Sequence, residues 1–409
     1  MTRRARSSRR GRPAFLAILL DAGFLSAVGL AILAVGTLSL LGGALPFGAG
    51  GGGGDNGGPA RTPAPSNVVV VDPRTKVPGS IAYVKSGNIW IQSGASARQL
   101  TNGGKDATPS WSPDGEWIYF IRTVEEDARY PWQGESSRYL LTYPLLMRVG
   151  LASAAVPEEL ASGRFTTKQG AWFYWLRQPA VSPDGTTLAI MSDGPDPTKR
   201  NVVLQFFDLA TGALTVSEAK ETAPLGHQDP AWRPSGGLLL FVRNDRDRTR
   251  GAPSIQRYDV STGKTSALTG PGYVAPSWSP DERFVAATRV TSFGTDVVIL
   301  DAATGVELLR LTSDERSFAP AWSPAGDAIA YFHVAHGIVD LRMVPLVGAG
   351  PDWTAGDALN LTEVSGLDAA SRPSWFIPAD ELPAPTPSPT PLATPAPAGS
   401  DAVPVSPVP

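Results

Sequence analysis

The stretch Pro109–Arg122, with the sequence PSWSPDGEWIYFIR, recurs along the chain with small changes. Four near-copies begin at further prolines: PAVSPDGTTLAIMSD at Pro179, PAWRPSGGLLLFVRN at Pro230, PSWSPDERFVAATRV at Pro276 and PAWSPAGDAIAYFHV at Pro320. A shortened copy, PSWFIPADE, begins at Pro373. Trp111 and its five counterparts are separated by 70, 51, 46, 44 and 53 residues. A strand-rich repeat of this period is typical of propeller blades, so the sequence predicts six blades.

Each unit has the pattern of a four-stranded antiparallel sheet. In the Ser-Pro-Asp-Gly segment the proline presets φ, the aspartate caps a turn and the glycine takes the left-handed conformation. An alternating strand such as TLAIMS follows. The third strand ends in another turn signal, for example Asp208–Gly212, and the fourth often closes with leucine and threonine, as at Leu268 and Thr269. Because the Ser and Asp of the first turn recur from blade to blade, we expect them to be structural.

The two ends of the repeat region complement each other. After Trp375 the chain has no alternating strand, whereas Ser80–Asn102 supplies a second, third and fourth strand with no first strand before them. We therefore predict that Ser374–Phe376 pairs with Ile81–Val84 and closes the sixth blade, which removes a free sheet edge. The predicted fold is all-β: a six-bladed β-propeller over residues 80–378, with its last blade built from both ends of the domain.

These units resemble the TolB-like, WD-repeat-like propeller repeats of bacteria. The shared pattern is leucine-threonine, a loop, proline, a small residue, Trp-Ser-Pro-Asp-Gly and an apolar strand, and it extends from Gly79 to Ala379. The resemblance implies a six-bladed propeller. Similar units occur in prolyl-oligopeptidase-type enzymes, but this chain has no Gly-x-Ser-x-Gly segment.

The N-terminal segment predicts a membrane anchor. Its first 12 residues contain six arginines and no acid, and residues 22–42 form an uncharged span long enough to cross a bilayer. The arginines predict a cytoplasmic N-terminus. We expect a basic cytoplasmic segment (1–21), a transmembrane helix (22–42), a Gly/Pro-rich linker (43–79), the extracytoplasmic propeller (80–378) and a disordered Pro/Thr-rich tail (379–409). The alternative is a cleaved signal peptide and a secreted propeller.

Composition excludes several classes of function. The net charge of −3 and the pI near 5.7 argue against nucleic-acid binding. The absence of cysteine excludes disulfides, thiolate metal sites and cysteine nucleophiles. His333, His336 and Asp340 could be metal ligands, and the alternating carboxylates of Arg243–Gly251 could hold calcium, but the sequence favours structural histidines in the first case and a solvated turn in the second. We therefore predict no metal, no cofactor and no catalytic residue.

The topology of a blade indicates where ligands bind. Loops between strands two and three, and loops leading to the next blade, emerge on one face, which we call the decorated face. The Ser-Pro-Asp-Gly turns emerge on the other, the plain face. The two largest departures from the repeat, Val124–Pro144 and Gly163–Gln178, both fall on the decorated face.

Two sets of candidate binding residues follow from this. The aromatic set, which could serve a partner protein or a sugar, is Tyr130, Trp132, Tyr139, Trp172, Phe173, Tyr174 and Trp175. The channel-mouth set, found just before the first strands, is Asp106, Gln178, Asp229, Phe318 and Arg372. The alternative for the aromatic set is local packing over a blade edge.

The sequence favours a membrane-anchored extracytoplasmic module that binds a protein, a peptide or a cell-envelope polymer. The alternative is an enzyme, a polysaccharide lyase or hydrolase, acting at the decorated face. A third hypothesis, a sensor signalling through its short cytoplasmic tail, has few residues to signal with.

Overall fold

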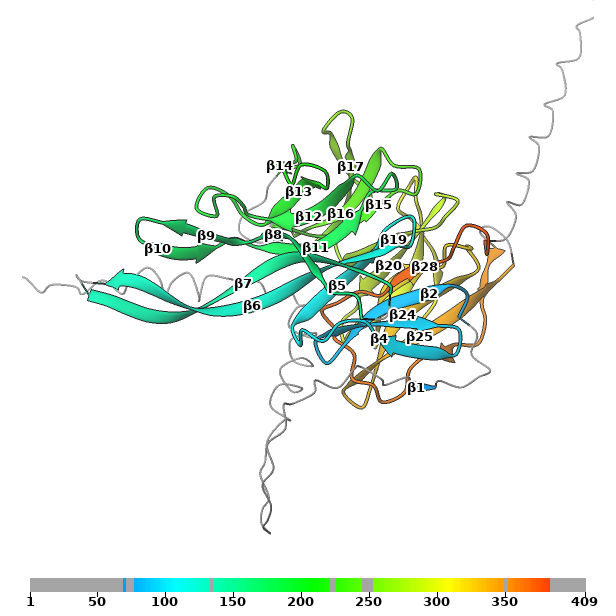
Figure 1. Ribbon diagram of the computed structural model, residues 1–409. Helices are drawn as coiled ribbons and strands as arrows, with labels where there is room; N and C mark the ends of the chain where they lie inside the picture. The colour runs from blue at the N-terminus through cyan, green and yellow to red at the C-terminus, as the bar shows by residue number, and fades with distance from the viewer. Residues whose placement is uncertain are drawn as a thin grey trace, which may run out of the picture.

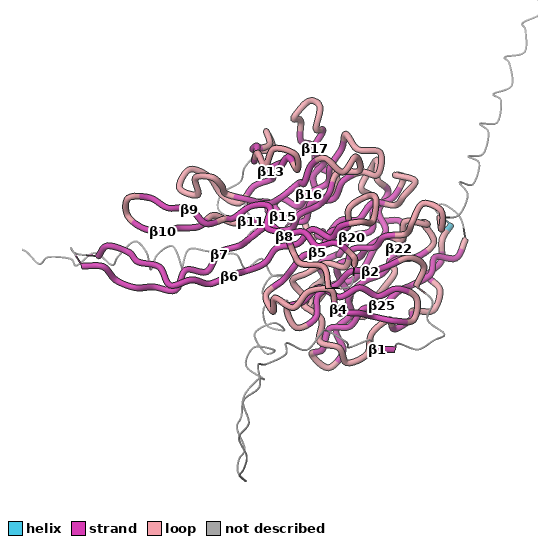
Figure 2. The backbone as a smooth tube through the Cα atoms, in the orientation of Figure 1, coloured by secondary structure: helices cyan, strands magenta, loops and turns pink. Residues whose placement is uncertain are grey.

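The computed structural model describes residues 69–70, 77–132, 135–152, 154–220, 226–244, 253–348 and 352–382, and for residues 69–70, 130–132 and 135–136 it describes the backbone alone. Within these ranges the chain forms β-strands and no α-helix, and none of them offers a helix able to cross a membrane. The expected transmembrane span 22–42 lies outside the described residues. Six antiparallel sheets form the blades of a ring, and a separate two-stranded sheet lies beside it (Figures 1 and 2).

The first three blades are consecutive four-stranded sheets, each in the order first to fourth strand. Blade 1 consists of β5 (Asp106–Trp111), β6 (Trp117–Trp132), β7 (Glu135–Gly150) and β8 (Glu158–Ser162). Blade 2 consists of β11 (Leu176–Val181), β12 (Thr187–Ser192), β13 (Val203–Asp208) and β14 (Leu214–Val216). Blade 3 consists of β15 (His227–Trp232), β16 (Leu238–Asn244), β17 (Pro253–Asp259) and β18 (Thr265–Ala267).

The remaining blades complete the ring. Blade 4 consists of β19 (Tyr273–Trp278), β20 (Phe284–Val290), β21 (Thr295–Asp301) and β22 (Glu307–Arg310). Blade 5 consists of β23 (Ser317–Trp322), β24 (Ala328–Ala335), β25 (Ile338–Val347), β26 (Thr354–Ala355) and β27 (Leu359–Asn360). Blade 6 consists of β28 (Ser374–Phe376), β2 (Ser80–Lys85), β3 (Asn88–Ser93), β4 (Ser96–Gln99) and β1 (Val69–Val70).

Blade 6 confirms the predicted closure of the ring. Ile81 pairs with Trp375 in the antiparallel register of β2 and β28. The Trp375 indole Nε1–H donates to the Pro78 carbonyl at 2.9 Å, so the two ends of the propeller are also joined through a side chain. In addition, β1 pairs with β4; part of the segment that we expected to be a linker thus adds an outer strand to this blade.

The repeated tryptophans join neighbouring blades. The Nε1–H of Trp232 donates to Ala180 O of the preceding blade at 2.9 Å, and that of Trp278 donates to Ala231 O at 3.2 Å. Trp111 donates to Ser374 O at 3.1 Å and stacks on Phe376 across the closure, with 5.2 Å between ring centroids. An indole combines a large apolar area with one donor that needs a partner when buried, which suits it to this position between two sheets.

The leucine-threonine motif has a hydrogen-bonding role. Threonine Oγ1 accepts a backbone N–H from the third strand of its own blade in four blades, from Ile89 to Thr101, Ile255 to Thr269, Val297 to Thr312 and Leu341 to Thr362, at 2.9–3.0 Å. In blade 2 the third-strand N–H of Leu204 is instead accepted by His227 of the next blade, whose Nδ1 lies 3.1 Å from Leu204 N while Nε2 faces the Lys220 carbonyl at 3.1 Å. His227 is therefore a structural histidine, with its proton on Nε2.

The Ser-Pro-Asp-Gly turns are structural, as predicted. In the first copy, Ser112 Oγ donates to Asp114 and accepts from Trp117 N at 2.9 Å, and Asp114 also accepts from Glu116 N at 2.9 Å. The hydrogen bond from Ser112 is the main reason that the pKa of Asp114 lies below its ordinary value. Asp184 has the same arrangement with Ser182, and its pKa is lowered for the same reason.

The two departures from the repeat lie side by side on the decorated face. Val124–Pro144, which we expected to be a loop, extends β6 and β7 into a long hairpin that projects from the ring, paired from Trp117↔Gly150 to Trp132↔Glu135 (Figure 1). A second hairpin, β9 (Arg164–Thr167) and β10 (Gly170–Phe173), packs on it. Ala128, Leu141 and Ala171 are buried between the hairpins.

Candidate binding site at the channel mouth

A backbone bulge in the first strand of five blades shapes the mouth of the central channel. The residue before the repeated proline has a positive φ, and the pairing with the second strand shifts there. These residues are Thr108, Gln178, Asp229, Ala275 and Ala319, with φ between 51° and 56°. A positive φ is uncommon outside glycine and carries a strain cost. Because the bulge recurs in five blades, it is a regular structural element of the ring.

A polar network crosses the channel at this level. Gln178 Nε2–H donates to Asp229 Oδ1 at 2.7 Å, and Asp229 N–H donates back to Gln178 Oε1 at 2.9 Å. Asp229 also accepts from Ala275 N at 3.0 Å. Arg372 donates to Pro230 O at 3.0 Å and Pro276 O at 3.3 Å, and its Nε lies 4.0 Å from Asp229 Oδ1. Because Arg372 precedes blade 6 and Pro230 belongs to blade 3, the side chain spans the bore of a six-membered ring.

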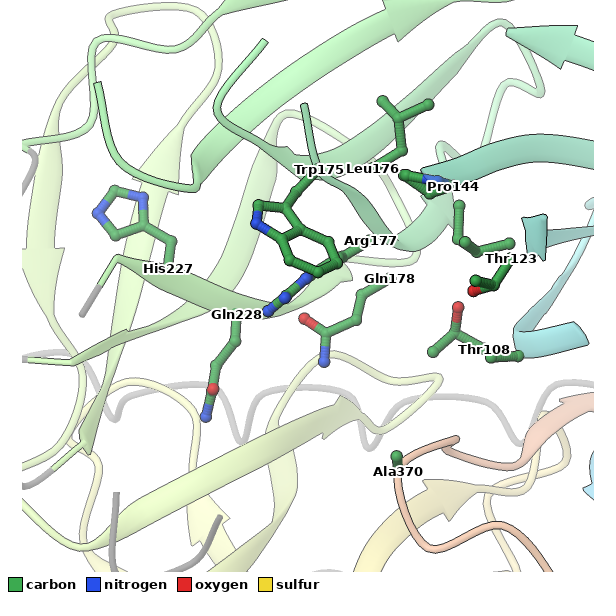
Figure 3. Close-up of a pocket in the computed structure, with 12 residues that line it drawn as sticks. Thr108, Thr123, Pro144, Trp175, Leu176, Arg177, Gln178, His227, Gln228 and Ala370 are labelled. Atoms are coloured by element: carbon green, nitrogen blue, oxygen red, sulfur yellow. The ribbon is translucent and has the colours of Figure 1, made fainter. Parts of the chain in front are cut away.

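A pocket of about 320 Å³ opens beside this network on the decorated face (Figure 3). Its walls come from the first three blades and from the segment before β28. Thr108 and Thr123 lie on the side of blade 1, Arg177 and Gln178 on that of blade 2, and Gln228 on that of blade 3. The pocket therefore joins the channel mouth to the base of the β6–β7 hairpin.

Trp175 and Arg177 form the most distinctive wall of this pocket. The guanidinium carbon of Arg177 lies 3.9 Å from the centroid of the Trp175 ring, and Phe173 meets that ring edge-on, with 5.1 Å between centroids. Trp175 is 38% exposed. Burial lowers the pKa of Arg177 to about 10, although the nearby Asp193 carboxylate acts in the opposite direction. The positive charge at this wall is thus poorly solvated.

Asp193 fixes the backbone next to this pair. Its Oδ1 accepts the Trp175 N–H at 2.6 Å. Burial raises the pKa of Asp193, while this hydrogen bond and the charge of Arg177 lower it. The wall of the pocket therefore contains one cation and one nearby anion, both partly withdrawn from water.

The channel-mouth set predicted from sequence divides into two groups. Gln178, Asp229 and Arg372 all directly precede the repeated proline, and the structure brings them together. Asp106 lies two residues earlier and forms a two-pronged ion pair with Arg122, with oxygen–nitrogen distances of 2.6 and 2.9 Å. Phe318 lies one residue earlier, is 6% exposed and packs on Phe332. These two residues are not part of the network.

The aromatic set is spread over the two hairpins. Tyr139 of β7 donates its hydroxyl to Ala171 O of β10, and Tyr174, just after β10, donates to Ser162 O of β8 at 2.9 Å, so both bonds tie the β9–β10 hairpin to blade 1. The Trp172 Nε1–H donates to Thr167 Oγ1 at 3.0 Å on the surface of β10. Tyr130 and Trp132 lie near the tip of β6, and their side chains are outside the described part of the chain. Among the aromatic residues Trp175 lines the pocket.

In the candidate metal site of His333, His336 and Asp340, the structure gives His333 and Asp340 structural roles. Most of the candidate calcium loop lies outside the described residues. Asp340 accepts hydrogen bonds from Thr362 Oγ1, Val364 N and Ser365 N, so its carboxylate caps a loop of blade 5. His333 lies 3.1 Å from Asp314, and burial is the main cause that lowers its pKa. Within the described ranges, no three side chains of metal-binding type come together. Most of Arg243–Gly251 is not described.

Arg177 and Gln228 are the site residues that the sequence analysis missed. They occupy the position two before the repeated proline, where the other blades have Ala107, Val274, Phe318 and Ser371. A comparison of the repeats position by position would have singled out the arginine, because it is the charged residue in a column of apolar and small ones. The long insertions, which are the larger departures from the repeat, do not reveal Arg177.

Comparison with known proteins supports the fold. No protein-family model matches the sequence. TolB from Acinetobacter baumannii superposes with a TM-score of 0.51 at 20% identity, over 72% of this chain and 66% of that one. A putative TolB from Agrobacterium tumefaciens gives 0.50 at 18% identity, over 73% and 94%. A chain of a nidogen–laminin complex gives 0.50 at 12% identity, over 72% and 97%.

The fold is a TolB-like six-bladed β-propeller. At these identities the likeness concerns the fold alone. This chain spans 66% of the length of the Acinetobacter protein.

Proposed function

We propose that this protein is a binding propeller that takes a protein, a peptide or a cell-envelope polymer at the channel mouth of its decorated face. The observation that carries the proposal is the pocket of about 320 Å³ between blades 1, 2 and 3. It lies where the regular ring meets the largest insertion, and it combines an exposed indole with a poorly solvated cation and two amide side chains. Pockets with a few convergent polar groups are the usual binding sites of folded domains.

The crossing network supports binding at the mouth rather than passage through the ring. Arg372 and Asp229 occupy the bore, so a ligand that enters from the decorated face meets a polar floor. A protein partner is also consistent with the comparison in which a chain of similar fold was solved within a nidogen–laminin complex.

Site-directed photo-crosslinking tests this function. A photoreactive amino acid at Gln228, inside the pocket, should capture a ligand in cells that make the protein. The same probe at Lys264, in an exposed turn of the plain face, is the matched control and should capture nothing specific. Equal adducts at the two positions, or none at Gln228, would contradict the proposal.

We also propose that residues 22–42 hold the propeller at the extracytoplasmic side of a membrane. The support is the arginine-rich segment followed by the uncharged span. Because the chain lacks cysteine, a single Lys264→Cys substitution should react with a membrane-impermeant maleimide in intact cells, whereas Ser7→Cys should not. Recovery of a soluble form that lacks the span would favour the cleaved signal peptide.

A further inference from the structure

We propose that the pocket at the channel mouth recognises a carboxylate of an extended acidic peptide, with Arg177 as the residue that binds it. This inference rests on the proposed function and specifies the class of ligand. It starts from the Arg177 side chain, which lines the pocket with Trp175 and Gln178 (Figure 3).

The placement of Arg177 favours an anionic group. The guanidinium is planar and matches a carboxylate through two parallel hydrogen bonds. Here it is held flat by the Trp175 ring, 3.9 Å from the centroid, so little side-chain freedom remains to be lost on binding. Burial already disfavours its charge, since the pKa falls to about 10. A carboxylate placed in the pocket would stabilise this charge.

The same geometry disfavours a sugar ring as the ligand. Stacking of a pyranose needs an open aromatic face, and Arg177 covers one face of Trp175 while Phe173 meets the ring edge-on. The exposed part of Trp175 can still pack against an aliphatic stem, such as that of a peptide side chain. The wall therefore fits a carboxylate on a chain better than a polysaccharide.

The neighbouring hairpin favours an extended peptide. Thr123 of β6 lines the pocket, and from Val124 to Trp132 the described residues of β6 pair only with β7. An open strand edge accepts an extended chain through main-chain hydrogen bonds. A peptide added along this edge would reach the pocket at Thr123 and present its side chain or terminus to Arg177.

The Asp193 carboxylate would compete with a ligand carboxylate for Arg177. Removing its charge therefore gives a test in which binding should become tighter. Its charge acts on Arg177, and it would repel a ligand carboxylate. Asp193→Asn keeps an oxygen to accept the Trp175 N–H but removes the negative charge. This variant should bind an acidic peptide more tightly.

The test uses the full chain and displayed random peptides of about twelve residues, a length suited to adding one strand. We expect the selected peptides to share an acidic residue whose change to the amide weakens binding by about tenfold, roughly 1.4 kcal/mol. Against Arg177→Met the same change should alter binding by less than about twofold, because the two groups are coupled in a double-mutant cycle. Asp193→Asn should tighten binding by about threefold, and Arg283→Met, on a plain-face turn, should leave it unchanged.

Four results would overturn the inference. Two concern the selected peptides: binding at the mouth without a required acidic residue, or an acidic peptide that binds Arg177→Met as tightly as wild type. The other two are failure to select any peptide, and displacement of the crosslinked ligand by a trisaccharide of uronic acid but by no peptide. Each leaves the proposed function standing as long as Gln228 crosslinks a ligand. Thermal unfolding of Arg177→Met at the wild-type temperature confirms that the variant is folded.

Discussion

The two halves of the channel are built from the same six first strands but differ in how far they follow the repeat. Toward the plain face, proline, a small residue and tryptophan recur, and they line a regular cavity of about 320 Å³ with contributions from all six blades. Toward the decorated face, the residue before the proline changes from Thr108 to Gln178, Asp229, Ala275, Ala319 and Arg372. In five of the six blades the bulge at this residue separates the two halves. The shared structural contacts thus lie where the blades are alike, and the proposed binding site lies where they differ.

The largest expected effect comes from a tryptophan of the plain-face half. Trp278 is 8% exposed, packs between blades 3 and 4 and donates to Ala231 O. Trp278→Ala should reduce the free energy of unfolding by about 3–5 kcal/mol, the usual range for removing a buried aromatic side chain. Urea denaturation measures this. Trp172→Ala, on the decorated face, is the control and should cost less than about 1 kcal/mol; equal costs would break the comparison.

The crossing network should have an intermediate effect on stability. Arg372→Met removes the donors to Pro230 O and Pro276 O and the cation beside Asp229. Hydrogen bonds that involve a charged group contribute about 1.5–3 kcal/mol, so we expect a loss of about 2 kcal/mol in urea denaturation. The exposed Arg283, changed to Met, should alter stability by less than about 0.5 kcal/mol. A loss no larger than this for Arg372→Met would mean that the network does not brace the ring.

The leucine-threonine motif should contribute less. Thr269→Val keeps the shape of the side chain but leaves the buried Ile255 N–H without its acceptor. The expected loss is about 1–2 kcal/mol. The matched control is Thr215→Val on exposed β14, expected within about 0.5 kcal/mol. If both variants unfold at the same urea concentration, the motif has no role in stability.

Acid should weaken the plain-face turns before it affects the sheets. The turn residues Asp208, Asp259 and Asp301 have lowered pKa values, mainly because of hydrogen bonds from Thr211, Ser261 and Thr304, respectively. A folded-state pKa below the unfolded value of about 3.9 stabilises the fold above that pH, and this stabilisation is lost as the pH falls through the folded-state pKa. The triple Asp→Asn variant should therefore show a flatter decline of stability below about pH 4. An unchanged pH profile would contradict this.

Much of the ring could be predicted from the sequence because its structural signals are local and repeated. Six tryptophan-like positions, the Ser-Pro-Asp-Gly turns and the missing first strand at Ser80 determine the number of blades and the pairing of Ile81 with Trp375. The long hairpin was located correctly on the decorated face, but as a loop, because its charged exposed side conceals the alternation along β6 and β7.

The candidate site was harder to predict because a shift of one residue along the first strand changes whether a side chain faces the channel. Asp106, Phe318 and Arg372 all precede a first-strand proline, but at three different distances. In blades 1 and 5 the left-handed residues Thr108 and Ala319 lie between the candidate and the proline, whereas Arg372 directly precedes its proline. Asp106 pairs with Arg122 instead, and Phe318 packs on Phe332. Arg177 was missed because its burial beside Trp175 arises from the fold and leaves no local motif.

The most direct test of the division between scaffold and site is to make blade 2 resemble its neighbours. Arg177→Val introduces the residue that Val274 supplies at the same position in blade 4. The measurement is photo-crosslinking at Gln228 in this variant, with the free energy of unfolding determined on the same preparation. We predict that the crosslinked ligand is lost while stability stays within about 1 kcal/mol of wild type. An undiminished adduct in a fully folded Arg177→Val protein would contradict the assignment of Arg177 as the residue that binds the ligand at the channel mouth.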